Sequence, residues 1–223
     1  MTRPPEFEID PKTFWEDPYP DLARLRAAAP VAYVPQLDAV LITRRDDISE
    51  QEKKTEVFAS EQPGGQNEPR DAIAGTAWAL LTHPEQLADV QAGRAAWLQA
   101  FEEYARWISP IGMSPRRVAR DHKLHGVTIA EGARAFLMFG SGNRDERVFA
   151  KPDHFDIHQD SSAAISFGAG PHFCAGAWAA KALIAEVALP LLFARLPGLR
   201  LAGAVPFGGW AFRGPLNMPV AWG

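Results

Sequence analysis

Ten consecutive residues near the carboxyl end of the chain carry the side chains best suited to chemistry. The segment Phe167-Gly-Ala-Gly-Pro-His-Phe-Cys-Ala-Gly176 holds Cys174, the single cysteine among 223 residues. One cysteine cannot form an intramolecular disulfide, and one isolated thiol is a poor zinc or iron–sulfur site. A single thiolate is instead what one face of a haem requires, and it donates electron density to the iron. The glycines allow a tight turn beneath a flat macrocycle, and amides at the opening of a helix can stabilise a thiolate.

The order of these residues resembles the haem-binding loop of cytochromes P450 of the bacterial type, whose pattern Phe-Gly-x-Gly-x-His-x-Cys-x-Gly is matched at every fixed position. The resemblance implies haem b (iron protoporphyrin IX) as the cofactor, with Cys174 as the proximal iron ligand and catalytic centre. It also implies that Phe167 packs under the porphyrin and that His172 hydrogen-bonds a propionate. Gly168 and Gly176 belong to the same cofactor-binding turn. The alternative is a buried structural cysteine in a glycine-rich turn.

Glu103 and Arg106 form a second motif, spaced i, i+3 on one face of a predicted helix. Taken alone, such a pair is an ordinary surface ion pair worth less than about 1 kcal/mol. Glu103 precedes Cys174 by 71 residues, however, which is similar to the spacing between the Glu-x-x-Arg helix and the haem cysteine of P450s. The resemblance implies a structural ion pair that anchors residues 150–156, with His154 at a position that the family often fills with arginine.

Arg116 and Arg117 lie in a predicted strand over residues 116–120, so their side chains face opposite ways. One of the two is expected to point toward the porphyrin, and counting from the preceding Ser-Pro-Ile run favours Arg116 as a propionate partner. The arginine fork suits a carboxylate. The alternative is an exposed strand arginine without a ligand.

Residues 68–83 predict a helix that resembles the latter part of the long central helix of P450s. In most members this helix carries an acid followed by threonine, which deliver protons to oxygen at the iron. Here Asp71 is followed by Ala72, and Thr76 lies about 140° around the helix from Asp71. This departure puts ordinary oxygen activation in doubt.

The chain is also much shorter than the P450s it resembles, which are nearly twice as long. The missing material is expected near residues 60–68, where P450s carry the helices that roof the substrate pocket. The Glu-Pro start of the helix that follows, and the run Trp-Ala-Phe-Arg-Gly-Pro at 210–215, are similar to the P450 branch that O-demethylates small aromatic ethers such as guaiacol.

Composition restricts the class of protein. With 47% hydrophobic residues, 223 residues can bury a full core in one domain or two. The resemblance implies a single P450-like domain over residues 1–223. A net charge of −4 and the lack of a basic cluster argue against nucleic acid as a partner. No stretch approaches the roughly 18 uninterrupted apolar residues of a membrane helix, and residues 1–20 lack a signal-peptide pattern. We therefore expect a cytoplasmic protein that is not bound to a membrane.

The sequence predicts a mainly α fold with small mixed β-sheets (α+β), equivalent by resemblance to a P450 fold without much of its distal helical region. A helix capped by Asp21 comes first, and the apolar helix 177–196 is expected to run behind the haem into the core. The other predicted helices are 45–57, 68–83, 85–90, 95–107 and 141–149. The predicted strands are 31–34, 39–43, 116–120 and 133–138, followed by late β structure at 207–213.

By resemblance, the activity is that of a haem-thiolate oxidoreductase, a monooxygenase that inserts one oxygen atom of O2 into a small organic substrate. The chain has no glycine-rich dinucleotide loop, and one cysteine cannot hold an iron–sulfur cluster. Electrons are therefore expected from a separate ferredoxin or flavin reductase, docking beside Lys181, Arg195 and Arg200. The alternative is a remnant that binds haem, or none, without monooxygenase turnover, or that acts as an unselective peroxidase. In that case a second copy of the chain, as a homodimer, is one way to cover the open haem face.

Overall fold

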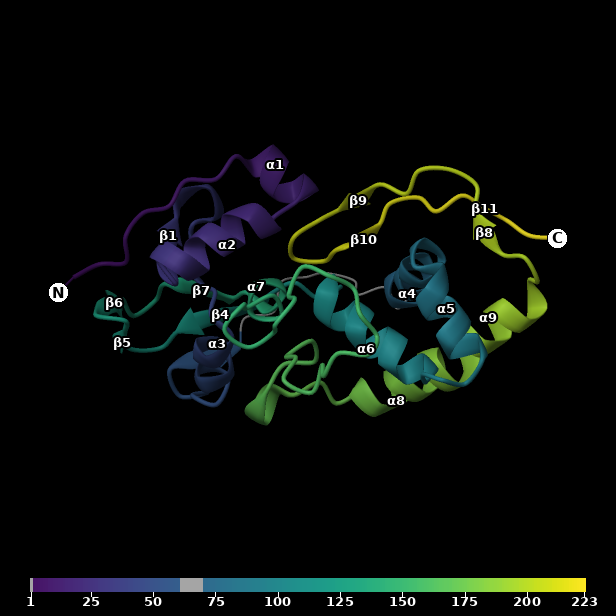
Figure 1. Ribbon diagram of the computed structural model, residues 1–223. Coiled ribbons are helices and arrows are strands. Elements are labelled where there is room, and N and C mark those ends of the chain that lie inside the picture. The colour runs from purple at the N-terminus through teal and green to yellow at the C-terminus, as the bar shows by residue number, and fades with distance from the viewer. Residues whose placement is uncertain (1, 61–69) are drawn as a thin grey trace.

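The computed structural model describes residues 2–60 and 70–223, with side chains for residues 2–60 and 72–223. A part built on a β-sheet and a part built from helices lie side by side, at the left and right of Figure 1. The predicted class, mainly α with small mixed sheets, is confirmed. The deletion expected near residues 60–68 falls, apart from Ser60, outside the described residues.

The sheet has five strands in the order β1-β2-β7-β4-β3, and only the β2–β7 pair is parallel. Its strands are β1 (Val31–Val34), β2 (Ala39–Ile42), β3 (Phe58–Ser60), β4 (Ser114–Val118) and β7 (Arg134–Leu137). Strand β2 is apolar at all four positions because both faces of the sheet are covered. Helices α1 (Pro11–Glu16) and α2 (Tyr19–Ala28) cover one face, and α3 (Arg45–Gln51) covers the other.

Three helices form the centre of the helical part: α4 (Arg70–Thr82), α5 (Pro84–Gln91) and α6 (Trp97–Trp107). Their apolar faces share one core, in which Leu80 and Tyr104 are fully buried. Because α6 has its charged pair Glu103 and Arg106 on the inward face too, that face also carries the polar contacts described below.

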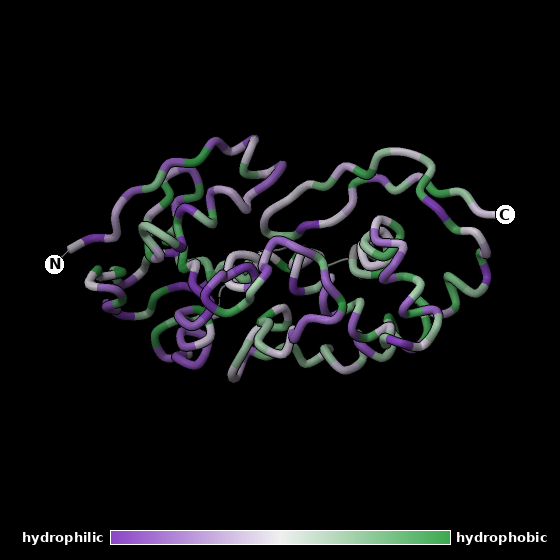
Figure 2. Tube along the Cα trace, in the orientation of Figure 1, coloured by the Kyte–Doolittle hydropathy of each residue, from purple (hydrophilic) through white to green (hydrophobic). Residues whose placement is uncertain are grey.

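The helical run after Cys174 comprises α8 (Ala177–Lys181), a π-helical segment (Ala182–Ala188) and α9 (Leu189–Arg195). Pro190 lies just beyond the π segment and removes one helical hydrogen bond. The prediction that this run enters the core is wrong for one of its faces. Trp178 and Leu183 are 76% and 55% exposed, whereas Ile184 and Leu189 are buried. Figure 2 shows hydrophobic residues along this run at the lower edge of the molecule.

By length and composition alone, this same run of 19 residues could cross a membrane, and in the described part of the chain it is the one helix of which this is true. Counting uninterrupted apolar residues missed it because Lys181 and Glu186 break the run.

Several element boundaries differ from those predicted. Asp21 lies in the first turn of α2, where its charge favours the helix dipole, but Pro18 occupies the cap position. Helix α3 ends at Gln51 instead of near residue 57, and α7 (Phe139–Gly142) is shorter than the helix expected over 141–149. The remaining short elements are η1 (Pro35–Leu37), β5 (His122–Leu124), β6 (Val127–Ile129), η2 (Gly170–His172), β8 (Arg200–Leu201), β9 (Phe207–Gly208), β10 (Gly214–Pro215) and β11 (Val220–Ala221).

Candidate functional site

One cavity of about 130 Å³ brings together five of the residues predicted to bind haem. These are Arg116, Phe167, Gly168, His172 and Cys174. The rest of its lining is Glu52, Ile111, Ser114, Phe139 and Ser166, so the end of α3, strand β4, α7 and the cysteine loop all meet there. The side chain of Cys174 is exposed. An exposed thiol on a cavity does not match the alternative of a buried structural cysteine.

The backbone of the cysteine loop explains its glycines. The N–H of Cys174 donates to the carbonyl of Phe167 (2.9 Å), closing the turn. Gly168 and Gly170 have φ values of +74° and +60°, which favour glycine over any other residue. A Cβ on Gly168 would also lie 3.2 Å from a carboxylate oxygen of Glu52. Gly176 lies outside the cavity lining, and a Cβ there would sit 3.9 Å from the Cys174 sulfur.

Arg116 is buried on β4 and faces the cavity, whereas Arg117, the next residue along, is exposed. Its Nη1 donates to the Ser114 hydroxyl (2.6 Å) and the Pro115 carbonyl (2.7 Å), and its Nη2 forms an ion pair with Glu52. Its Nε is buried without a hydrogen-bond partner among the described residues. On the edge of the guanidinium formed by Nε and Nη2, only Nη2 therefore has a hydrogen-bond partner among the described residues.

Phe167 is half-buried beside the cysteine and packs edge to face on Phe101, with ring centroids 6.2 Å apart. His172 lies in the same loop, is exposed, and also lines the cavity. An open thiol, an aromatic ring beside it and a buried guanidinium with an unused N–H form a donor set that fits a haem, which needs a thiolate, an apolar contact and carboxylate partners.

Glu103 and Arg106 lie on the inward face of α6 and are 1% and 0% exposed. The two carboxylate oxygens of Glu103 accept from Nε and Nη2 of Arg106, both at 2.8 Å. The remaining guanidinium hydrogens go to the carbonyls of Asn143, Pro152 and His154, each at 2.9 Å. Glu103 also accepts from the N–H of Asp156 and from Gln159. Every partner in this network is satisfied, as a buried ion pair requires.

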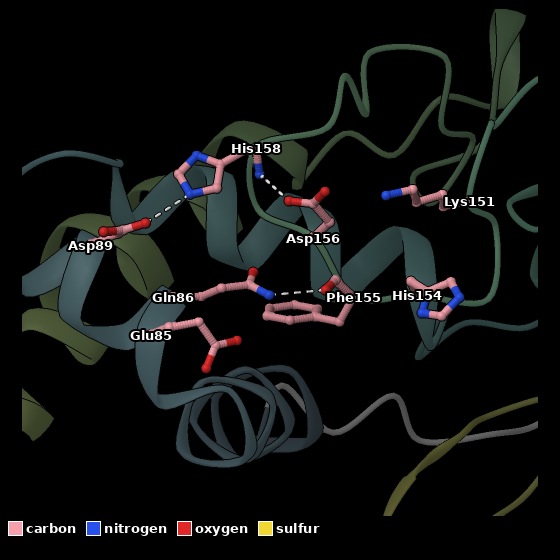
Figure 3. Close-up of a pocket in the computed structure, with 8 residues that line it drawn as sticks. All are labelled: Glu85, Gln86, Asp89, Lys151, His154, Phe155, Asp156 and His158. Carbon is pink, nitrogen blue, oxygen red and sulfur yellow. Dashed lines mark hydrogen bonds and ion pairs between the residues drawn. The ribbon is translucent and has the colours of Figure 1, made fainter.

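His154 joins this network through its backbone and not, as predicted, through its side chain. Its carbonyl accepts from Arg106, while the imidazole is exposed and lines a different cavity of about 390 Å³, drawn in Figure 3. The Glu103 carboxylate and three backbone carbonyls already accept every N–H of Arg106, so the imidazole has no hydrogen bond to make there. Apart from Phe155, the residues that line that larger cavity are polar or charged, and among them His158 hydrogen-bonds Asp89 at 2.9 Å. It is separate from Cys174, so we place the candidate site at the smaller cavity.

Two residues of the site were missed by the sequence analysis. Asn143 is fully buried, and its side chain donates to the hydroxyls of Ser109 and Ser166 and accepts from the N–H of Ile165 at 2.7 Å. It therefore holds the segment that leads into the cysteine loop. Glu52 is the other, because its position within a run of charged residues is typical of a solvated surface.

Asp145 ties α3 to the turn after α7. Its fully buried carboxylate accepts from the N–H of Arg45 (3.0 Å) and pairs with Arg147. Burial by itself raises the pKa of a carboxyl, but the hydrogen bonds from Arg147 and Arg45 outweigh it, and the pKa of Asp145 lies below its ordinary value.

This shift predicts an acid-dependent loss of stability. A lowered pKa in the folded state means that the stabilisation is present above the unfolded pKa of about 3.9 and is lost as the pH falls through the lower folded value. We expect Asp145→Asn to reduce the free energy of unfolding by about 1–3 kcal/mol at pH 7, with the difference from wild type shrinking below about pH 4. Urea melts from pH 7 to pH 2.5 measure this, with the exposed Asp46→Asn as the control; a difference independent of pH would contradict it.

Among the side chains that the structure describes in α4, the Thr76 hydroxyl is already committed to a hydrogen bond within the helix. The hydroxyl of Thr76 is buried and donates to the carbonyl of Ala72 at 2.7 Å within α4. The side chain of Asp71 lies outside the described residues. Lys181, expected at a partner-docking surface, pairs with Glu102 at 2.6 Å and lies over the Phe167 ring.

Comparison with known proteins identifies relatives of this chain in sequence and in fold. The family model described as cytochrome P450 matches residues 98–196. The chain is 38% identical over 130 residues to the biotin biosynthesis cytochrome P450 of Bacillus subtilis and 42% identical over 122 residues to 6-deoxyerythronolide B hydroxylase of Saccharopolyspora erythraea. It is also 32% identical over 193 residues to nocardicin C N-oxygenase of Nocardia uniformis. These matches cover 58%, 55% and 83% of this chain but only 33%, 30% and 48% of the relatives.

Solved structures give the same result. P450BioI, solved in complex with an acyl carrier protein carrying hexadec-9Z-enoic acid, matches 70% of this chain and 41% of its own at a TM-score of 0.65 and 35% identity. Cytochrome P450 CYP109Q5 from Chondromyces apiculatus matches 97% of this chain and 98% of its own at a TM-score of 0.85, and at 18% identity this shows the fold alone. The chain, although it spans less than half the length of these curated relatives, belongs to the bacterial cytochrome P450 family, which implies a haem-iron cofactor.

Proposed function

We propose that this chain is a haem-thiolate oxidoreductase that binds haem b through Cys174 and acts as a monooxygenase on a small organic substrate. The observation that carries the proposal is the cavity where the exposed thiol of Cys174 meets Phe167 and the buried Arg116. When bound, the haem supplies the chemistry by which one oxygen atom of O2 enters a substrate at the expense of two electrons. The names of the relatives, a hydroxylase and an N-oxygenase among them, are consistent with this class.

Each residue of the site has a proposed role that follows from its position. Cys174 ligates the iron, and Phe167 provides apolar contact beside the sulfur. Arg116 and His172 hold the propionates, Arg116 from the buried side of the cavity and His172 from the exposed side. Gly168 shapes the loop through its left-handed backbone, whereas Gly176 is the residue before α8, has a φ of −86° and lies outside the cavity.

Glu103 and Arg106 are positioning residues in this proposal. They bind the carbonyls of Asn143, Pro152 and His154, and Asn143 in turn holds Ile165 and Ser166 just before the cysteine loop. A rigid scaffold for the thiol keeps the iron ligand in one place and costs no reorganisation during the reaction.

The second candidate is a haem protein without monooxygenase turnover, or one with unselective peroxidase activity. The observation that favours it is the Thr76 hydroxyl, which is committed to the Ala72 carbonyl and has no acid directly before it in the sequence. The sequence of this helix therefore does not contain the acid–threonine pair that usually moves a proton toward oxygen.

The wider setting of the activity is also proposed. We infer that electrons come from a separate ferredoxin or flavin reductase, because one cysteine cannot hold an iron–sulfur cluster. We also infer a cytoplasmic location. The match to nearly the full length of a solved P450 chain is consistent with sequence missing inside this chain, and we propose that the deletion lies near residues 60–68. A homodimer covering the open haem face and a small aromatic ether as substrate, by likeness to the O-demethylase branch, complete the proposal.

The proposal is tested by loading the purified chain with haem and recording iron content and the reduced carbon monoxide difference spectrum. A thiolate-type band with one haem per chain is expected. Substrate oxidation driven by reductase and O2 then separates the monooxygenase from the second candidate. A purified chain that takes up no haem and shows no Soret absorption would overturn both.

A further inference from the structure

We propose that Glu52 competes with haem propionate for Arg116 and thereby sets how tightly this site holds its cofactor. The inference rests on the proposed function, because it concerns the same cavity. Glu52 is 1% exposed and follows directly after α3, and its carboxylate pairs with Nη2 of Arg116, which is 4% exposed. The two residues are 64 positions apart in the sequence, and both line the cavity that contains Cys174.

The two buried arginines of the site differ in how their forks are used. On Arg106, the edge made by Nε and Nη2 is filled by both oxygens of Glu103. On Arg116, the same edge receives one oxygen of Glu52 at Nη2, and Nε is the buried nitrogen that lacks a partner among the described residues. A carboxylate that occupied both nitrogens would satisfy Arg116 fully, and such bidentate pairing is the strongest form of this contact.

Glu52 cannot provide that second contact because its other oxygen faces the cysteine loop. That oxygen accepts from the N–H of Ala169 at 3.4 Å and lies 3.2 Å from where a Cβ on Gly168 would be. One oxygen of the Glu52 carboxylate thus contacts Arg116 on β4, and the other contacts the loop that carries Cys174. An incoming propionate on Nη2 must displace Glu52 or lie beside a second buried negative charge, and either event weakens its binding.

The inference predicts that removing the charge of Glu52 tightens haem binding. In absorbance titrations of the haem-free chain, Glu52→Gln should bind haem about tenfold more tightly than wild type. Haem dimethyl ester, which has no free propionates, should bind both proteins equally within about twofold. The matched control is Glu50→Gln, two residues away: its carboxylate is 56% exposed and pairs only loosely with Lys53 and Lys54. This control should bind both ligands as wild type does.

The outcomes separate the inference from the proposed function. Equal or weaker haem binding by Glu52→Gln, with a normal Soret band, would overturn the competition and leave haem binding intact. A lack of Soret absorption in every variant would overturn both. If Glu52→Gln does not fold, wild type alone decides: competition predicts that haem and its dimethyl ester differ in affinity by less than about threefold, whereas a tenfold advantage for haem would refute the competition.

Discussion

Replacing Cys174 by serine is expected to abolish the thiolate-type band of the reduced carbon monoxide complex completely. Cys174 is the sole thiol in the chain, so no other residue can supply a thiolate. An alcohol stays protonated at neutral pH and gives the iron far less electron density than a thiolate does. The side chain is exposed, so exchanging sulfur for oxygen leaves no buried cavity. The free energy of unfolding of the haem-free variant should therefore lie within about 0.5 kcal/mol of the wild-type value.

The measurement is a pair of spectra and melting curves for wild type and Cys174→Ser. Ser162→Ala serves as the control and should keep the thiolate band. Ser162 is exposed and lines a neighbouring cavity that also includes Phe167. Haem uptake by the serine variant with a band at the position of a nitrogen or oxygen ligand would still support the assignment. Persistence of the thiolate band would remove Cys174 as the ligand.

The local sequence was sufficient to predict the turn of the cysteine loop. Gly168 and Gly170 adopt left-handed backbone conformations that few other residues tolerate, so the glycine pattern encodes the turn directly. Strand alternation likewise separates buried Arg116 from exposed Arg117. Such features depend on neighbours in the chain, and a sequence pattern can record them.

Features that depend on distant contacts could not be predicted in the same way. Glu52 pairs with Arg116, but Glu52 precedes α4 in the sequence and Arg116 follows α6. No residue near Glu52 in the sequence distinguishes it from an acid on the surface. His154 enters the Arg106 network by its carbonyl, which every residue possesses, so its side-chain type was no guide. The exposed face of the run 177–195 depends on which elements pack against it, and an apolar sequence alone predicts burial.

Glu103→Gln is expected to reduce the free energy of unfolding by about 3–5 kcal/mol, because it leaves the fully buried Arg106 without its counter-charge. For a chain of this size, the melting temperature should fall by roughly 6–20 °C. The neighbouring change Glu102→Gln is the control: the ion pair of Glu102 with Lys181 is partly exposed and should contribute less than about 1 kcal/mol. Thermal melts of the haem-free proteins measure both, and equal melting temperatures for the two variants would contradict the prediction.

The same comparison tests whether the Glu103 network positions the haem ligand. Glu102 is itself part of a cavity lining beside Phe167, whereas Glu103 is linked to the start of the cysteine loop indirectly, through Arg106 and Asn143. If distance to the site decided the effect, Glu102→Gln would disturb haem binding more. Because a satisfied buried network holds a backbone in place, and a broken one releases it, we expect Glu103→Gln to weaken haem binding and broaden the thiolate band while Glu102→Gln leaves both unchanged.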